Sequence, residues 1–186
     1  VICPQRKGDL GMMDLNQKLQ QRLNPPAPNK PECKSLFYTF RTGDKVMQIR
    51  NNYDLEWSKG TESGQGIFNG DIGIIKMIDN GSQTMAINFE ERVAYYSFEM
   101  ANELELAYAI TVHKSQGSEF EAVVIPVMGG YKKLYYRNLL YTAITRAKKL
   151  LILVGREEQV RQMIENNLKS HRFTNLTYFL ENIDPQ

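Results

Sequence analysis

The sequence has few of the residues and segments that mark several classes of protein. Its 186 residues include two cysteines and two histidines, which are too few for a disulfide framework or for a metal site built from these ligands. It contains no apolar run of about eighteen residues, the length that a helix needs to cross a membrane. Apolar residues make up 42% of the chain and charged residues 24%, with a net charge of +2, as in ordinary globular proteins. We therefore expect a cytoplasmic protein with no metal of its own and no membrane partner.

A phosphate-binding segment is also absent. No G-x-x-x-x-G-K-[ST] occurs in the sequence, so the chain lacks the loop whose backbone N–H groups and lysine hold nucleotide phosphates. The chain opens on Val1-Ile2-Cys3-Pro4, which resembles the end of a strand. The absence of the phosphate-binding loop excludes a nucleotide-binding domain of the P-loop type within the sequence.

The last part of the chain alternates between apolar strands and amphipathic helices. Strands are predicted over 104–110, 122–128 and 150–154, and helices over 134–147 and 157–168. A strand, a helix and a strand in succession imply a right-handed crossover and a parallel sheet. The last of these strands is almost wholly apolar, which predicts that both of its faces are covered. The fold class is therefore α/β with a parallel sheet.

The first part of the chain fits the same pattern. Apolar side chains at helical spacing predict a helix over 12–23, with Asn16 and Gln20 on its surface or at its ends. Four prolines follow between positions 25 and 31, which predicts an extended connection.

Residues 36–103 carry a different pattern, with several short strand signals and many glycines. Asn80-Gly81 lies between two apolar segments and predicts a hairpin. Short strands with turns at close spacing favour a small β-barrel, and we interpret this region as an insertion into the α/β domain. The region contains the aromatic side chains Tyr53, Trp57, Phe68, Tyr95 and Tyr96. Such rings can stack on nucleic-acid bases, but we expect most of them to fill the barrel core.

Two polar segments adjoin the apolar strands after residue 104. The first is AITVHKSQGSEF at 109–120, directly before EAVVIPV, and the second is LLYTAITRAK at 139–148, which runs into KLLILVG. Open α/β sheets bind their ligands at the carboxyl ends of strands. We therefore expect the two segments to contribute to one functional site.

The two segments closely resemble the fifth and sixth conserved motifs of RecD-like superfamily 1 helicases, the family of the exodeoxyribonuclease V alpha subunit. PQRKGDLGMMDLNQKLQ at 4–20 resembles the fourth motif, and GDKVMQIRNNYD and FNGDIGII resemble the SH3-like barrel of that family. The resemblance implies a second RecA-like domain, residues 1–35 and 104–186, with an SH3-like barrel inserted at 36–103. It also implies a C-terminal fragment of a motor whose ATP-binding half lies upstream.

The resemblance assigns nucleotide contacts to several residues. It implies that Arg146 is the arginine finger that reaches the γ-phosphate of ATP held by the other RecA-like domain, because guanidinium is always charged and can bind phosphate with two N–H groups. The alternative is a cation that only stabilises the end of a helix. Further nucleotide contacts are implied for Gln116, Gly117, Glu119 and Arg6.

The resemblance also assigns single-stranded DNA contacts to Thr111, His113 and Lys7. A hydroxyl, an imidazole and an ammonium group can each donate a hydrogen bond to a phosphate oxygen. A structural role for His113, and a merely solvated basic loop for Arg6 and Lys7, remain as alternatives.

The function implied is the C-terminal motor half of an ATP-dependent DNA helicase or translocase that moves 5′ to 3′ in DNA repair and recombination. ATP and Mg²⁺ would be held mainly by the N-terminal RecA-like domain, so the fragment alone should be inactive. The implied partners are single-stranded DNA, that N-terminal domain and exonuclease V subunits. Two other functions stay open: a helicase-like module of a conjugative relaxase, which an upstream three-histidine cluster would indicate, and a non-catalytic nucleic-acid-binding domain, which the lack of any upstream phosphate loop would indicate.

Overall fold

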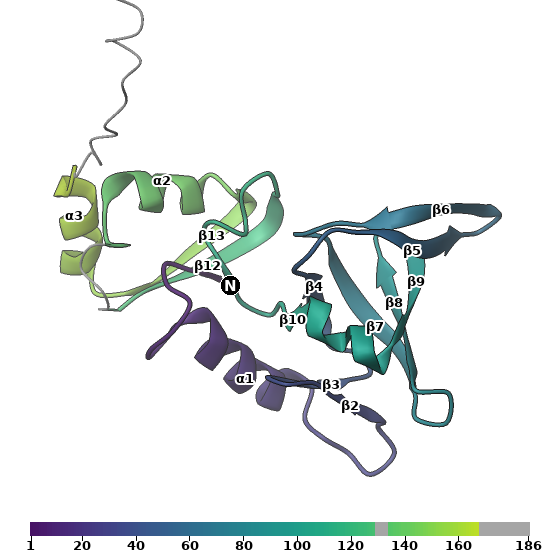
Figure 1. Ribbon diagram of the computed structural model, residues 1–186. Coiled ribbons are helices and arrows are strands. Elements are labelled where there is room, and N and C mark those ends of the chain that lie inside the picture. Colours follow the sequence, from purple (N-terminus) through teal and green to yellow (C-terminus); the bar gives the residue numbers. More distant parts are fainter. Residues whose placement is uncertain (129–133, 168–186) are drawn as a thin grey trace, which may run out of the picture.

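The computed structural model describes residues 1–128 and 134–167, which form an α/β part and a β part side by side (Figure 1). The N-terminus lies between the two parts, and the chain leaves the α/β part after the first helix and returns to it near residue 107. Within the described residues, no helix is long and apolar enough to span a membrane.

The α/β part contains two parallel strand pairs. Strand β1 (Ile2–Cys3) pairs with β11 (Ile110–Thr111), and β12 (Phe120–Val127) pairs with β13 (Ala147–Gly155). Helix α2 (Arg137–Ile144) connects β12 to β13, which confirms the predicted strand–helix–strand unit. The predicted helix over 157–168 is α3 (Glu157–Glu165), and residue 168 lies outside the described residues. The fold is therefore the predicted α/β class with parallel strands.

The β part is a seven-stranded antiparallel sheet in the order β10-β4-β7-β8-β9-β5-β6. The strands are β4 (Lys45–Gln48), β5 (Asn52–Lys59), β6 (Glu62–Ile67), β7 (Ile72–Asp79), β8 (Thr84–Phe89), β9 (Arg92–Ser97) and β10 (Leu104–Leu106). A short 3₁₀ helix, η1 (Phe98–Glu103), precedes β10, and the hairpin of β2 (Glu32–Lys34) and β3 (Thr39–Arg41) precedes β4. Among the described residues, β10 and β6 are the two edge strands of this sheet.

Two local predictions in this region need correction. The single strand predicted over 104–110 is two strands, because β10 pairs with β4 in the antiparallel sheet and only β11 returns to β1. The hairpin at Asn80-Gly81 exists, but its register pairs Asp79 with Thr84, so four residues form the turn. Gln83 rather than glycine takes the left-handed conformation there, with φ of 53°. The sequence pattern locates such a turn better than it defines the turn's type.

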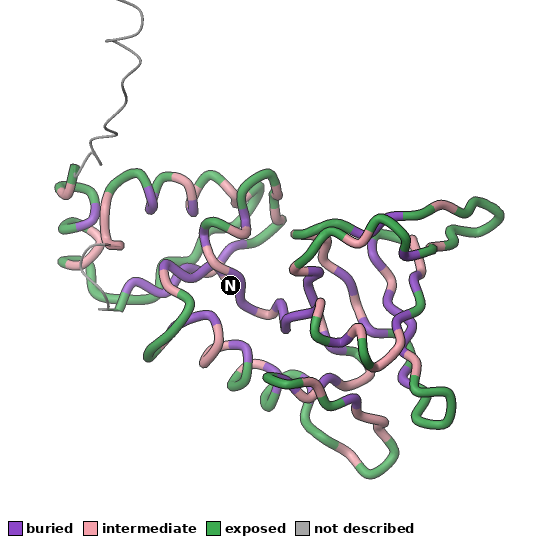
Figure 2. The backbone as a smooth tube through the Cα atoms, in the orientation of Figure 1, coloured by how far each residue is buried: buried purple, intermediate pink, exposed green. Residues whose placement is uncertain are grey.

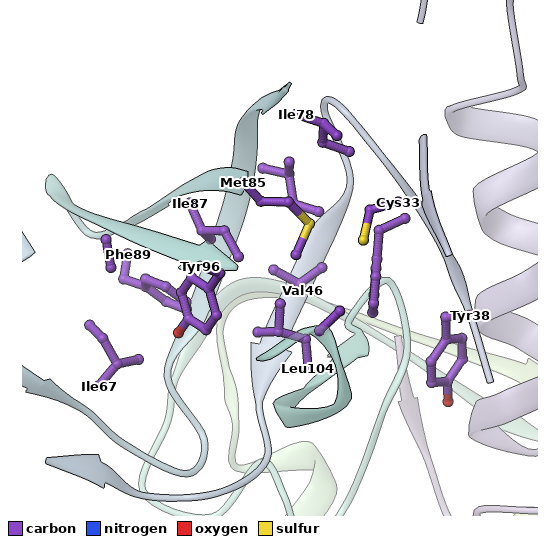
Figure 3. Packing of buried hydrophobic residues seen from close by; sticks show 14 of the residues in the cluster. Cys33, Tyr38, Val46, Ile67, Ile78, Met85, Ile87, Phe89, Tyr96 and Leu104 are labelled. Atoms are coloured by element: carbon purple, nitrogen blue, oxygen red, sulfur yellow. The ribbon is translucent and has the colours of Figure 1, made fainter. Parts of the chain in front are cut away.

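Each part has its own hydrophobic core. Figure 3 shows the core of the β part, in which Phe89, Tyr96 and Ile87 are fully buried. The α/β core lies between β12 and the helices α2 and α3, and Met47 of β4 and Ile72 of β7 pack against it from the β part. The two parts therefore share an apolar contact. The division of the chain at 35/36 and 103/104 stays a prediction.

The barrel aromatics do not mostly fill the core. Tyr96 is fully buried, but Tyr53, Phe68 and Tyr95 are 66%, 41% and 59% exposed. Trp57 is partly buried and packs against the core. The prediction that most of these rings are buried was wrong, because Tyr53 and Tyr95 lie on the solvent face of their strands and Phe68 lies in the turn between β6 and β7.

Helix α1 (Met12–Leu23) has a polar buried face, which contradicts the prediction for Asn16 and Gln20. Asn16 is fully buried, and its amide donates to the carbonyl oxygens of Leu106 at 2.8 Å and Ala109 at 2.9 Å. Its carbonyl accepts the Ala109 N–H at 2.7 Å. The helix is thus fixed to the returning segment by hydrogen bonds that an apolar side chain could not make.

A second buried polar group, the carboxylate of Asp44, joins the same helix to the β part. It is fully buried and accepts hydrogen bonds from the amides of Gln20 and Asn24, both at 2.6 Å. It also accepts the backbone N–H of Arg41 at 2.7 Å and the hydroxyl of Tyr108 at 2.8 Å. The pKa of Tyr108 is raised, mainly by burial and to a smaller extent by the neighbouring Asp44 carboxylate. The phenol therefore stays protonated and donates its hydrogen bond.

Strand β13 is more exposed than its composition predicts. Side chains from Leu150 to Val154 are between 38% and 51% exposed, although a strand covered on both faces was expected. Within the described residues β13 has one neighbouring strand, β12, and Figure 2 shows exposed backbone along much of its course. An apolar sequence predicts that a strand can be buried, but its burial depends on the elements that pack against it.

We predict that Asp44→Asn lowers the free energy of unfolding by about 2 to 4 kcal/mol. The neutral amide keeps one acceptor oxygen and turns an NH₂ group toward donors that it cannot satisfy. Denaturant unfolding followed by circular dichroism measures this loss. Asp79→Asn is the matched control, because Asp79 also accepts turn hydrogen bonds, at 2.8 Å from the Gly81 N–H, but in an exposed turn. Similar losses for both variants would show that Asp44 is only a turn residue.

Candidate functional site

The predicted site residues lie at two different ends of the parallel strands. Thr111 ends β11 beside Cys3 of β1, so the loops that carry Arg6, Lys7 and His113 follow the carboxyl ends of that pair. Glu119 and Arg146 instead precede β12 and β13, whose register pairs Phe120 with Ala147. The start of the first segment thus lies at a carboxyl strand end, whereas its last residues and Arg146 lie at the amino ends of β12 and β13.

The segment 111–119 is a compact loop that folds on itself. The Thr111 hydroxyl accepts the N–H of Lys114 at 3.3 Å, and the Thr111 carbonyl accepts the N–H of Ser115 at 3.0 Å. Ser115 is fully buried and donates its hydroxyl to the Val112 carbonyl at 2.7 Å. His113 and Gln116 are exposed. Ser115 is not among the predicted site residues, but its buried hydrogen bond fixes the shape of the loop and leaves His113 and Gln116 exposed.

Gly117 adopts a left-handed backbone conformation. Its φ is +83°, which side chains rarely adopt, and no atom lies within 4 Å of the position where a Cβ would be. Backbone geometry rather than crowding therefore demands glycine, and the space beside it is open to a ligand.

Arg146 joins the two motif segments. It follows α2 in a turn, is half-buried, and donates from Nε to the Thr142 carbonyl at 3.2 Å. Nη1 donates to the Ser118 carbonyl at 3.3 Å, and Nη2 donates to the Thr145 hydroxyl at 3.3 Å. The carbonyl of Arg146 accepts the N–H of Phe120 at 2.8 Å. Within the described part of the chain, all acceptors of the guanidinium are neutral, and no carboxylate is paired with it.

A polar hollow of about 570 Å³ lies between the loop and the β part. Arg146, Gly117 and Glu119 line it from the α/β side, and Lys45, Asp71 and Arg92 line it from the β side. Glu119 is paired with Lys148 at 3.4 Å, and Arg92 with Asp71 at 3.5 Å. Burial lowers the pKa of Lys45. Lys45 belongs to the barrel-like segment GDKVMQIRNNYD and Arg92 to no quoted motif. Neither pattern predicts a place beside Arg146, where only the packing of the two parts brings them.

Arg6 and Lys7 occupy a loop that curls back onto the first turn of α1. The N–H groups of Met12 and Met13 donate to the carbonyls of Gln5 and Arg6 at 3.0 and 3.1 Å. The guanidinium of Arg6 forms an ion pair with Glu105, whose side chain is 9% exposed. Lys7 is exposed. Arg6 is therefore engaged with strand β10, whereas Lys7 faces solvent.

The described residues contain no group of three or more histidine, cysteine or acidic side chains that could hold a metal ion. Both cysteines are buried free thiols, and burial raises the pKa of Cys3 to about 11. Neither thiol is in a state suited to nucleophilic or metal chemistry.

Two family models match the chain. Residues 15–89 match the SH3 domain of ATP-dependent RecD-like DNA helicases, and residues 106–154 match the UvrD-like helicase C-terminal domain. The first match covers most of the β part together with α1, and the second covers the loop 111–119 and Arg146.

Two curated relatives carry names of the same family. The chain is 34% identical over 155 residues to the ATP-dependent RecD2 DNA helicase of Deinococcus radiodurans, covering 83% of this chain and 20% of that protein. It is 27% identical over 165 residues to the RecBCD enzyme subunit RecD of Mycolicibacterium smegmatis, covering 89% and 26%. An uncharacterized protein, MJ1519, of Methanocaldococcus jannaschii is 36% identical over 206 residues, covering 99% and 17%. The chain thus spans between 17% and 26% of the length of these relatives.

Solved structures support the fold. A structure of two coordinating Pif1 helicases on forked double-stranded DNA aligns with a TM-score of 0.55 at 18% identity, covering 97% of this chain and 44% of that chain. Bacteroides Pif1 bound to single-stranded DNA aligns with a TM-score of 0.55 at 16% identity over the same shares. Motif segments, fold and relatives agree, and the chain belongs to the RecD-like family of superfamily 1 helicases.

Proposed function

We propose that this chain is the second motor unit of an ATP-dependent DNA helicase or translocase, and that Arg146 is its arginine finger. The observation that carries the proposal is the guanidinium of Arg146, which has no acidic partner among the described residues. It is held in place by three neutral oxygens, while the nearby Glu119 is paired with Lys148. A fixed cation without an acidic partner is suited to stabilise an anion that arrives from outside the chain.

The geometry of Arg146 leaves donors for a phosphate group. A guanidinium has five N–H groups, and the contacts to Thr142, Ser118 and Thr145 use one each on Nε, Nη1 and Nη2. One N–H on each terminal nitrogen then remains for a ligand. Two parallel N–H groups can bind a phosphate in the bidentate manner that distinguishes arginine from lysine.

ATP and Mg²⁺ belong in the proposal as ligands held mainly by a different domain. The sequence has no phosphate-binding loop, and the described residues offer no cluster of acidic ligands for a metal. The residues present therefore fit one part of a nucleotide site, a γ-phosphate contact by Arg146 with Gln116, Gly117 and Glu119 nearby. The chain alone should not hydrolyse ATP, because the phosphates would have no cradle.

Contacts to single-stranded DNA are proposed for Thr111, His113 and Lys7. His113 and Lys7 are exposed, and Thr111 ends strand β11, which pairs with β1. The loops that follow parallel neighbouring strands leave the sheet at the same edge, so these donors can follow one phosphate backbone. Movement from 5′ to 3′ and association with exonuclease V subunits are proposed from the family resemblance.

The proposed domain division is a RecA-like unit of residues 1–35 and 104–186 with a barrel at 36–103. Two separate hydrophobic cores support it. The barrel core also includes Cys33 and Leu106, which the proposed bounds assign to the RecA-like unit, and the α/β core includes Met47 of the barrel.

We expect Arg146→Ala to reduce DNA-stimulated ATP turnover by about a thousandfold in the protein assembled with its phosphate-binding domain. Arg146→Lys should recover little, because an ammonium group cannot make two parallel N–H contacts. The melting temperature should fall by only about 2–4 °C, since a cation at a helix end contributes about 1 kcal/mol or less. Steady-state ATPase assays and thermal melting on the same samples test both statements.

Arg161→Ala is the control for the loss of an arginine. Arg161 lies on α3, is 71% exposed and pairs with Glu157 one helical turn away, so turnover should not change. Normal turnover in Arg146→Ala would reduce Arg146 to a helix-end charge, and a large loss of thermal stability would give it a structural role.

We predict that Thr111→Ala and His113→Ala each weaken the stimulation of ATP hydrolysis by single-stranded DNA by about threefold to tenfold, the equivalent of one hydrogen bond. Thr111→Ser is the matched control, because it keeps the hydroxyl that also accepts the Lys114 N–H. DNA binding should weaken as salt rises, because phosphate neutralisation releases counterions. Unchanged stimulation in both alanine variants would assign the loop to structural support.

A further inference from the structure

Two exposed aromatic rings of the β part lie against each other. Tyr53 lies in β5, and Phe68 lies in the turn between β6 and β7. Their ring centroids are 5.6 Å apart and the ring planes are inclined by 69°. Tyr53 is 66% exposed and Phe68 41%. The pair therefore has a fixed mutual geometry and still presents ring surface to solvent.

The surrounding backbone holds the Phe68 ring in place. Gly66 has a φ of +99°, and a Cβ there would lie 2.7 Å from Phe68 Cζ, so the ring rests directly on the strand. The N–H of Phe68 donates to Asp71 at 3.0 Å, and the N–H of Asn69 donates to the Asn51 side chain at 3.0 Å. The platform is thus ordered before any ligand arrives, which reduces the entropy lost on binding.

The ring pair is connected to the loop 111–119. Lys114 Nζ donates to the side-chain oxygen of Asn69 at 2.6 Å, and Asn69 is the neighbour of Phe68. Lys114 in turn follows His113 in the chain. Arg50, near Tyr53, is exposed and makes no ion pair among the described residues. Cations and amides therefore border the two rings, where a broad apolar interface for a protein would have further apolar side chains.

We propose that Tyr53 and Phe68 form a stacking platform for a nucleobase of single-stranded DNA whose phosphates lie along Lys114 and His113. The inference rests on the proposed DNA contacts of the 111–119 loop and adds a base-binding subsite to them. Every base presents a π-face, so aromatic stacking binds single strands without regard to sequence. The nearby cations neutralise the phosphates on either side.

The test compares two oligonucleotides by fluorescence anisotropy on the intact protein: oligodeoxythymidylate and an abasic strand of equal length. Wild-type protein should prefer the thymidylate strand. Tyr53→Ala and Phe68→Ala should each weaken thymidylate binding about tenfold, within the range of one stacked base, and leave binding of the abasic strand unchanged. Tyr53→Phe keeps the ring and should bind normally. Thermal melting confirms that each variant is folded.

Tyr95→Ala is the matched control, because Tyr95 is 59% exposed on β9 of the same barrel but lines a separate hollow with Trp57. Its thymidylate affinity should equal that of wild type. Lys114→Gln should weaken the binding of both oligonucleotides equally. It should also reduce the salt dependence of binding by the equivalent of about one phosphate contact.

The outcomes separate the two proposals. If the wild-type protein binds neither strand, the proposed DNA contacts fail, and this inference fails with them. If the protein prefers thymidylate but Tyr53→Ala and Phe68→Ala retain that preference, only the stacking platform is overturned, and the ring pair becomes a surface for a protein partner or a cover for Gly66. An equal loss on both strands also overturns stacking, as does a loss in Tyr95→Ala as large as in Tyr53→Ala.

Discussion

The buried polar junction of helix α1 fixes the relation between the two parts of this molecule. An inserted domain leaves and re-enters its host at two places, and each crossing has to be held in one geometry. The Asp44 carboxylate accepts hydrogen bonds from Gln20 and Asn24 at the end of α1 and from the Arg41 N–H where the chain enters the β part. It also accepts one from Tyr108, where the chain returns to the α/β part. Asn16 binds the second crossing again at Ala109. Apolar packing alone is not directional, whereas satisfied buried hydrogen bonds permit one arrangement and penalise the others. Because Thr111 follows Ala109 by two residues, this junction also positions the loop that carries the proposed DNA contacts.

That loop is where the two halves of the proposed chemistry meet. At one end Ser118 accepts a hydrogen bond from Arg146, and near its middle Lys114 donates one to Asn69 of the β part. A movement of bound single-stranded DNA near Lys114 would therefore act on the loop 111–119, whose other end contacts the guanidinium of Arg146. The buried Ser115, which donates to Val112, gives the loop a defined shape between these two points.

The sequence was sufficient for the motifs, the fold class and the inserted barrel, because each depends on a local pattern: strand–helix–strand order, close turn spacing and two distinctive segments. It was insufficient where the outcome depends on distant partners. Asn16 and Gln20 look like surface residues until Ala109 and Asp44 are placed against them. The apolar run at β13 predicts cover that the described strands do not supply on both sides. Lys45 and Arg92 enter the hollow beside Arg146 only because the barrel packs there, and no periodicity contains that information.

The turn of Phe68 to Asp71 connects the barrel to both proposed sites. Phe68 forms the ring pair with Tyr53, and Asn69 binds Lys114 of the loop. Gly70 and Asp71 line the hollow that contains Arg146. A single tight turn, closed by the hydrogen bond from the Phe68 N–H to Asp71, thus has one end at the proposed base-binding surface and the other at the proposed nucleotide side. In a motor, occupation of one site has to alter the other, and two sites can be coupled only through an element that contacts both. This turn contacts the ring pair, the loop and the hollow, so it is an element that can couple the two proposed sites.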